Sequence, residues 1–237
     1  MRMKKIAKCV ALGIAALGIL ASAGCGEQAD KGEKTYKVGI VQLVEHSSLD
    51  DANRGFVDGL KERGYEEGKN LTIDRQNAQA DQSNLQNIVQ RFISDKVDLI
   101  CAIATPAVQS AANATKDIPI VGTAVTDYVS AKVVKSNDAP GGNVTGTSDL
   151  TPIAEQIDLL MKLYPNAKTI GTIYSSSEVN SEIQVKAMKE YAESKGLTVR
   201  VATISTVNDI QQAAQSIIND VDVFYEPTDN VIASAMP

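Results

Sequence analysis

The sequence predicts an α/β protein with two Rossmann-like lobes, each built on a parallel sheet, joined by a hinge. Three observations favour this fold. Short β-rich runs alternate with segments of helical periodicity, this alternation occurs twice, and the two halves share short stretches of sequence on either side of the turn residues Pro140-Gly141-Gly142. Strands that alternate with helices form parallel sheets with right-handed crossovers. Two such lobes imply a cleft between them.

The first lobe, residues 37–147, is expected to contain four strands, at 38–43, 70–74, 97–102 and 118–122. The third run is almost entirely apolar, as in a strand buried on both faces. Helices lie between the strands: one with an apolar face from Ala52 to Leu60, one that begins after the capping residue Asp81, and one that opens with Thr105-Pro106. Residues 127–150 are predicted to be irregular.

The second lobe, residues 148–237, repeats this order. A helix opening with Thr151-Pro152 is followed by strand 168–174, helix 178–195, strand 197–203, helix 208–219 and strand 221–225. Val38-Gly39 corresponds to Ile170-Gly171, and Val97-Asp98 corresponds to Val221-Asp222. These matches indicate two similar lobes, with the hinge near 146–150.

The N-terminus has the features of a secretory signal. Residues 1–24 contain four cations, no acid, an apolar run at 10–20 and small residues immediately before Cys25. Small residues before a cysteine resemble the lipobox of bacterial lipoproteins, so we expect Cys25 to be acylated; secretion without lipid is the alternative. Residues 25–36 are polar and suit a flexible tether. The protein is thus expected to be exported and lipid-anchored at the cell surface or in the periplasm.

Composition excludes several functions. The 237 residues carry a net charge of −6, which becomes −10 when the cationic signal is removed, so a nucleic-acid partner is not expected. The single histidine and three cysteines, of which only Cys101 lies in the body, give no metal site and no internal disulfide. We expect no cofactor.

Ligands of open α/β sheets bind beyond the carboxyl ends of the strands, where helices begin. This rule selects loops that carry polar side chains, and it gives no candidate catalytic residue. The expected ligand-binding residues are Gln42, Glu45, His46, Thr105, Asp127, Tyr174, Ser176, Ser177, Asn180, Thr228 and Asp229.

The fixed charges in these loops are all negative, which favours an amine and disfavours phosphate or a dicarboxylate. Helix N-termini could still hold one carboxylate, so a zwitterionic amino acid fits, with Tyr128 and Tyr174 as a stacking wall. Several of the same serines and acids could instead serve only as helix caps. If Asp229 pairs with an amine, Asp229→Asn should weaken binding and leave the melting of the empty protein nearly unchanged.

Seven segments in order resemble the bacterial ABC-transporter substrate-binding lipoproteins of the tryptophan/tyrosine-binding type. They are Val-Glu-His at 44–46, Ala-Asn-Arg-Gly-Phe-Val-Asp-Gly-Leu-Lys at 52–61, Gly-Tyr-Glu-Glu-Gly-Lys-Asn at 64–70, Ala-Ile-Ala-Thr-Pro-Ala at 102–107, Ala-Thr-Lys-Asp-Ile-Pro-Ile-Val at 114–121, Pro-Gly-Gly-Asn-Val-Thr-Gly at 140–146 and Pro-Thr-Asp-Asn at 227–230.

The resemblance implies a type I periplasmic-binding-protein fold that closes on a small solute, such as an aromatic amino acid, and delivers it to a permease with its ATPase. It implies a monomer with no enzymatic activity. The family continues beyond the point matched by Pro237, so the second lobe is expected to be incomplete and this chain poorly stable alone. A ligand-sensing receptor domain and a two-Rossmann-domain enzyme are the alternatives.

Overall fold

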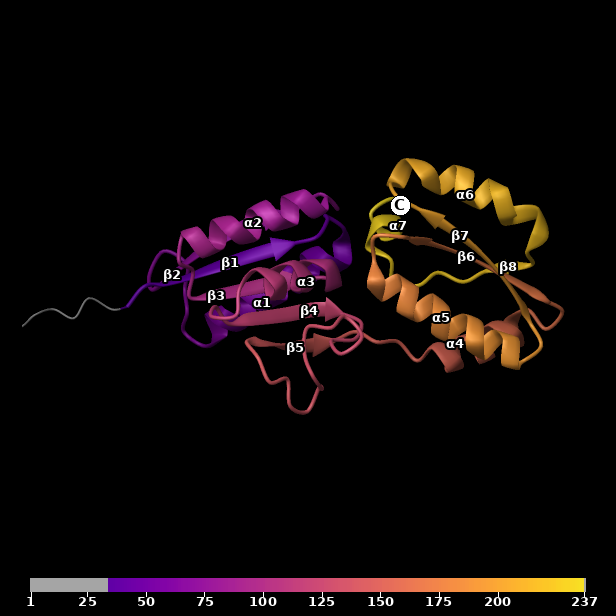
Figure 1. Ribbon diagram of the computed structural model, residues 1–237, viewed down its shortest axis with the longest axis horizontal. Coiled ribbons are helices and arrows are strands. Elements are labelled where there is room, and N and C mark those ends of the chain that lie inside the picture. The colour runs from indigo at the N-terminus through magenta and orange to yellow at the C-terminus, as the bar shows by residue number, and fades with distance from the viewer. Residues whose placement is uncertain (1–33, 237) are drawn as a thin grey trace, which may run out of the picture. The chain divides into compact units, whose positions relative to one another are not determined.

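Two parallel sheets, one in each half of the chain, organise the computed structural model, which describes residues 34–236 (Figure 1). The first sheet has the strand order β2-β1-β3-β4-β5. Every pair of neighbouring strands in it is parallel. Its strands are β1 (Tyr36–Gln42), β2 (Leu71–Asn77), β3 (Leu99–Ile103), β4 (Ile120–Val125) and β5 (Val144–Ser148).

Three helices cover the first sheet. Helices α2 (Gln82–Ser94) and α3 (Thr105–Ala114) pack against each other, and α1 (Ser47–Glu62) contacts β1, β3 and β4. Aliphatic side chains of β1, β3 and β4 are fully buried against them, with Phe92 as the largest buried side chain. The apolar run predicted as a buried strand is therefore the centre of this core, because β3 has neighbours on both edges.

The second sheet has the order β7-β6-β8, with β6 (Thr169–Ser175), β7 (Thr198–Ile204) and β8 (Val223–Phe224) all parallel. Helices α4 (Ile153–Leu163) and α5 (Val179–Ser194) cover one face and α6 (Ile210–Ile217) covers the other (Figure 1). The short helix α7 (Asn230–Ala233) follows β8 and contacts β6. The chain thus has the expected α/β architecture of two lobes.

The repeated glycines occupy equivalent places in the two sheets. Gly39 lies in β1 and Gly171 lies in β6, and each of these strands is the first of its sheet in the sequence and has a neighbouring strand on both edges. A Cβ atom at Gly39 would lie 2.6 Å from the ring of Phe92, and one at Gly171 would lie 3.0 Å from the ring of Phe224. Each glycine therefore makes room for an aromatic ring that packs close to its strand.

The repeated aspartates also perform one task in both lobes. Asp98 accepts a hydrogen bond of 2.8 Å from the backbone N–H of Lys37, at the start of β1. Asp222 accepts from the backbone N–H groups of Lys168 and Thr169, at the start of β6, at 2.7 and 2.9 Å. These bonds hold the pKa of both carboxyls below the usual range. The sequence repeat is therefore a structural repeat.

The predictions fail locally in three places. Residues 144–148, expected to be irregular, form the edge strand β5, because pairing with β4 supplies an order that the local sequence does not signal. Thr105 is the first residue of α3 and not its cap; Ala104 precedes the helix with φ of +82°. The predicted helix 208–219 is α-helical only over α6, because 3-10 turns at 207–209 and 218–220 form its two ends.

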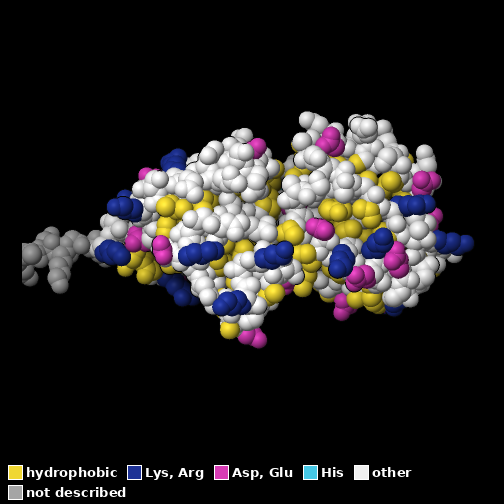
Figure 2. Space-filling view, viewed as in Figure 1, with side chains coloured by type: hydrophobic (Ala, Val, Ile, Leu, Met, Phe, Trp, Pro, Cys, Tyr) yellow, Lys and Arg dark blue, Asp and Glu magenta, His cyan; other side chains and the backbone are white. Residues whose placement is uncertain are grey.

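The predicted signal peptide at 1–24, Cys25 and most of the tether lie outside the described residues. Within 34–236, no helix is long and apolar enough to cross a bilayer. That same part of the chain contains no group of three or more His, Cys, Asp or Glu side chains placed to hold a metal. On the face drawn in Figure 2, lysine and arginine side chains are interspersed with acidic ones.

Candidate functional site

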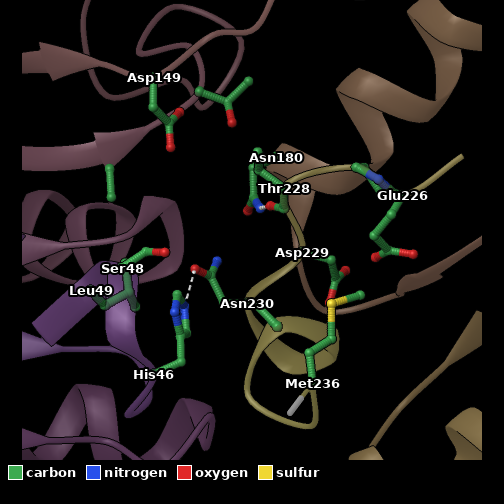
Figure 3. Close-up of a pocket in the computed structure, with 14 residues that line it drawn as sticks. His46, Ser48, Leu49, Asp149, Asn180, Glu226, Thr228, Asp229, Asn230 and Met236 are labelled. Atoms are coloured by element: carbon green, nitrogen blue, oxygen red, sulfur yellow. Dashed lines mark hydrogen bonds between the residues drawn. The ribbon is translucent and has the colours of Figure 1, made fainter. Parts of the chain in front are cut away.

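A cavity of about 240 Å³ is lined by residues of both lobes (Figure 3). Its lining comes from the start of α1, the ends of β4 and β5, the start of α5, and the segment from β8 through α7. Each of these places is the carboxyl end of a strand or the beginning of the next helix, as expected for a ligand site of open α/β sheets. The residues are His46, Ser48, Leu49, Ala124, Thr126, Asp149, Asn180, Glu226, Pro227, Thr228, Asp229, Asn230, Ala233 and Met236.

The charge of this cavity is acidic. Asp149, Glu226 and Asp229 line it, whereas none of its lining residues is a lysine or arginine. Desolvation, helped by the nearby Asp229, raises the pKa of Glu226 to about 8, although the residue keeps an exposed side that weakens the effect. Desolvation likewise raises the pKa of Asp149. An entering cation would favour the ionised form of both groups.

Asp229 is buried and accepts three hydrogen bonds within the protein. Its Oδ2 accepts from the backbone N–H of Ser175 and the hydroxyl of Ser181, both at 2.7 Å. Its Oδ1 accepts from the backbone N–H of Ile232 at 3.0 Å and so caps α7. Asp229 is 2% exposed. Its carboxylate therefore ties together the ends of β6, α5 and α7 beside the cavity.

Glu178 is a second buried carboxylate, and it holds residues that line the cavity. It accepts from Asn180 Nδ2 at 2.9 Å, from the backbone N–H groups of Asn230 and Val231 at 3.0 Å each, and from Asn230 Nδ2. Burial and the charge of Asp229 raise the pKa of Glu178, and the amide donors act in the opposite direction. Glu178 thereby fixes the orientation of two asparagine amides that line the cavity.

Asn180 presents an unused acceptor. Its Nδ2 donates to Glu178 and, at 3.0 Å, to the backbone oxygen of Thr228, which fixes the orientation of the amide. Its Oδ1 is buried and has no hydrogen-bond partner, and the side chain lines the cavity. A buried acceptor without a partner is costly, so this atom is suited to a ligand N–H or O–H group.

Part of the lining is apolar. Leu49 and Ala124 come from the first lobe, and Ala233 and Met236 come from the second. Ala124 has φ of +54°, in a β-bulge of β4. Strained backbone of this kind is common at ligand sites. The cavity thus combines an acidic, hydrogen-bonding part with an apolar part.

The structure brings four predicted site residues, His46, Asn180, Thr228 and Asp229, together in the cavity. The other predicted residues lie elsewhere. Most of them are engaged within their own lobe: Gln42 bonds Val44, Asp50 and Asn53; Asp127 accepts from the backbone of Ser130; Ser176 bonds the backbone of Ile204; and Ser177 bonds Ser175. Glu45 is exposed. The buried Thr105 hydroxyl has no partner.

The expected tyrosine wall does not line the cavity. Tyr128 is buried in the first lobe, where its hydroxyl donates to the backbone oxygen of Thr147 at 3.0 Å. Tyr174 packs against the core of the second lobe. Both side chains are used in packing, which the position of a loop along the sequence does not disclose.

The expected ligand-binding residues omit five polar lining residues, which are Ser48, Thr126, Asp149, Glu226 and Asn230. Glu226 and Asn230 are the first and last residues of the loop 226–230, which contains the expected residues Thr228 and Asp229. Their polar side chains alone could have added them to the expected set. Asp149 follows β5 directly. Because that strand was not predicted, its carboxyl end was not searched for ligand residues.

Two α/β lobes with a polar cavity between them are the architecture of a two-lobed solute-binding protein. Residues 37–237 match the family of ABC transporter substrate binding proteins. The chain belongs to this family. It is thus a binding protein of an ABC transporter rather than an enzyme.

Three relatives illustrate the similarity. The tyrosine-binding protein of Clostridioides difficile (strain R20291) is 47% identical, over all of this chain and 71% of its own length. A Streptococcus pneumonia ABC domain in complex with L-Trp is 43% identical, with a TM-score of 0.81 over 85% of this chain and 68% of that one. A ligand-free, open substrate binding protein with adhesive properties from Clostridium difficile is 50% identical, with a TM-score of 0.60 over 86% and 69%.

Proposed function

We propose that this protein captures an amino acid, most favourably an aromatic one, in the cavity between its lobes and delivers it to an ABC permease and its ATPase. The observation that carries the proposal is the side chain of Asn180, a lining residue of the acidic cavity whose buried Oδ1 has no hydrogen-bond partner. Such a group accepts a hydrogen bond from an ammonium, and Glu226 and Asp149 balance the charge.

The carboxylate of the ligand has a candidate partner in the first lobe. Helix α3 begins at Thr105, no side chain caps this end, and the buried Thr105 hydroxyl has no partner. A helix N-terminus favours an anion. Ala104 donates to the backbone oxygen of Thr123, which places this end beside β4, the strand that contributes Ala124 to the cavity and is followed by the lining residue Thr126. The apolar lining then receives the ligand side chain.

The relatives support the choice of ligand class, because one is named for tyrosine and another holds L-Trp. We also propose that the mature protein begins at an acylated Cys25, acts as a monomer and is anchored outside the cytoplasmic membrane. Export and acylation follow from the lipobox-like sequence before Cys25.

Calorimetric titration with ligand analogues tests the assignment of the two ligand ends. L-Tryptophan should bind, whereas indole-3-propionate, which lacks the amine, should bind at least about 100-fold more weakly, because it leaves Asn180 and the carboxylates unpaired. Tryptamine, which lacks the carboxylate, tests the α3 end in the same way. Equal affinity for L-tryptophan and indole-3-propionate would refute the amine site. Failure of all twenty amino acids to bind would refute the ligand class.

A further inference from the structure

Two side-chain hydrogen bonds within residues 34–236 join the lobes across the cleft. His46 Nε2 lies 3.3 Å from Asn230 Oδ1, and Gln184 Nε2 donates to Thr126 Oγ1 at 3.0 Å. The first of these bonds is drawn as a dashed line in Figure 3. Both residues of this pair line the cavity. The pair therefore borders the space that a ligand would occupy.

The chemistry of Glu178 determines which end of the Asn230 amide faces His46. A carboxylate only accepts, and the Asn230 side chain donates to it through Nδ2. The amide oxygen must then point away from Glu178, toward His46. Because this oxygen accepts, the imidazole must donate from Nε2. The backbone N–H of Asn230 also donates to Glu178, which fixes the residue at two points.

His46 is free for this contact. It occupies the N-cap position of α1, yet its side chain makes no capping hydrogen bond there. The backbone oxygen of His46 instead accepts from Asp50 N at 3.0 Å, which holds the residue at the helix start. The imidazole is thus placed by α1 of one lobe, and its acceptor is placed by Glu178 of the other.

The comparison structures relate this arrangement to the ligand state. The chain is more similar to the relative that holds L-Trp, with a TM-score of 0.81, than to the ligand-free, open relative, with 0.60, although the second is the more identical in sequence. The contacts between the lobes therefore occur in a structure that resembles the ligand-bound relative.

We propose that His46 and Asn230 form a latch that holds the two lobes together over a bound solute, and that Glu178 is the positioning residue that sets the latch. The proposal deepens the proposed function and rests on it for the identity of the solute. A latch formed after the ligand enters slows dissociation more than it affects association.

Dissociation kinetics test the latch directly. With L-tryptophan as the probe, His46→Ala should raise the dissociation rate about 3- to 10-fold, the effect of one hydrogen bond, and change the association rate less than about twofold. Asn230→Ala should act similarly, and the double variant should dissociate no faster than the more affected single variant. Thr126→Val removes the other interlobe bond and should add its effect to that of His46→Ala. Additive effects of His46→Ala and Asn230→Ala would overturn the latch.

A spectroscopic measurement tests the role of Glu178. His46 is the single histidine of the chain, so long-range ¹H–¹⁵N spectra of a protein without a histidine tag report its tautomer without ambiguity. At pH 8.5 the wild type should carry the proton on Nε2. In Glu178→Gln the new amide donates toward Asn230, whose amide must reverse, so His46 should shift to the Nδ1–H tautomer. Glu182→Gln, an exposed glutamate on the same helix, is the matched control.

The two ideas can fail separately. If wild-type protein binds neither L-tryptophan nor L-tyrosine, the proposed ligand is wrong; if it binds one of them and His46→Ala leaves the dissociation rate unchanged, the latch is wrong. If the amino acid binds but the tautomer is the same in wild type and Glu178→Gln, Glu178 does not position Asn230. A folded Glu178→Gln protein with the Nδ1–H tautomer and faster dissociation supports the proposal.

Discussion

Replacing Asp229 by asparagine removes a charge that three donors share. The side chain is 2% exposed and accepts from Ser175 N, Ser181 Oγ and Ile232 N at 2.7, 2.7 and 3.0 Å. An asparagine can direct its single oxygen to Ser175 and Ser181, but its NH₂ group then faces the N–H of Ile232. The substitution therefore opposes two donors at the start of α7.

The magnitude follows from the bond that is lost. A hydrogen bond to a charged group contributes about 1.5–3 kcal/mol, and the two remaining bonds also weaken without the charge. Relief of repulsion from Glu178 offsets part of this loss. We expect the free energy of unfolding to fall by about 2–3 kcal/mol, which lowers the melting temperature by roughly 5–10 °C in a chain of this size. The prediction from sequence, made for the case in which Asp229 pairs with an amine, was a nearly unchanged melting temperature.

Differential scanning calorimetry of the ligand-free protein measures this effect. Asp127→Asn is the matched control, because Asp127 is only half-buried and accepts from one backbone N–H, that of Ser130. It should lower the melting temperature by less than half as much as Asp229→Asn. A melting temperature of Asp229→Asn within about 2 °C of the wild type would refute the assignment of Asp229 as a structural acceptor.

Two further predictions concern Gly39, which is compared with Gly171 of the second lobe, and the buried thiol of Cys101. Gly39→Ala places a methyl group 2.6 Å from the buried ring of Phe92 and should lower the free energy of unfolding by about 1–3 kcal/mol. Gly171→Ala faces Phe224, which is 39% exposed and can move, so it should cost less than half of that. Urea unfolding of both variants measures these losses, and equal losses would contradict the prediction. Burial raises the pKa of Cys101 to about 12. Iodoacetamide at pH 8 should therefore leave this thiol unmodified in the folded protein and alkylate it in urea, as measured by peptide mass spectrometry. Rapid alkylation of the folded protein would show that the thiol is accessible.

The sequence by itself determined the architecture. Hydrophobic periodicity located the central strands and their helices, because burial of one face imposes a local pattern on each element. The repeats at Gly39 and Gly171 and at Asp98 and Asp222 indicated two similar lobes, and the structure gives each pair one physical role. Of the residues that the rule of strand ends selected, His46, Asn180, Thr228 and Asp229 line one cavity.

Only the tertiary structure decided how each polar side chain is used. Asp229 and Asn180 are both polar residues at the start of a helix, yet the first accepts from three donors and the second keeps a buried acceptor without a partner. Tyr128 and Asp149 were misjudged because the edge strand β5 is ordered by pairing with β4 and not by its own sequence. Local pattern reports which residues are buried or begin a helix; the direction of a hydrogen bond depends on neighbours that are distant in sequence, and only folding brings them together.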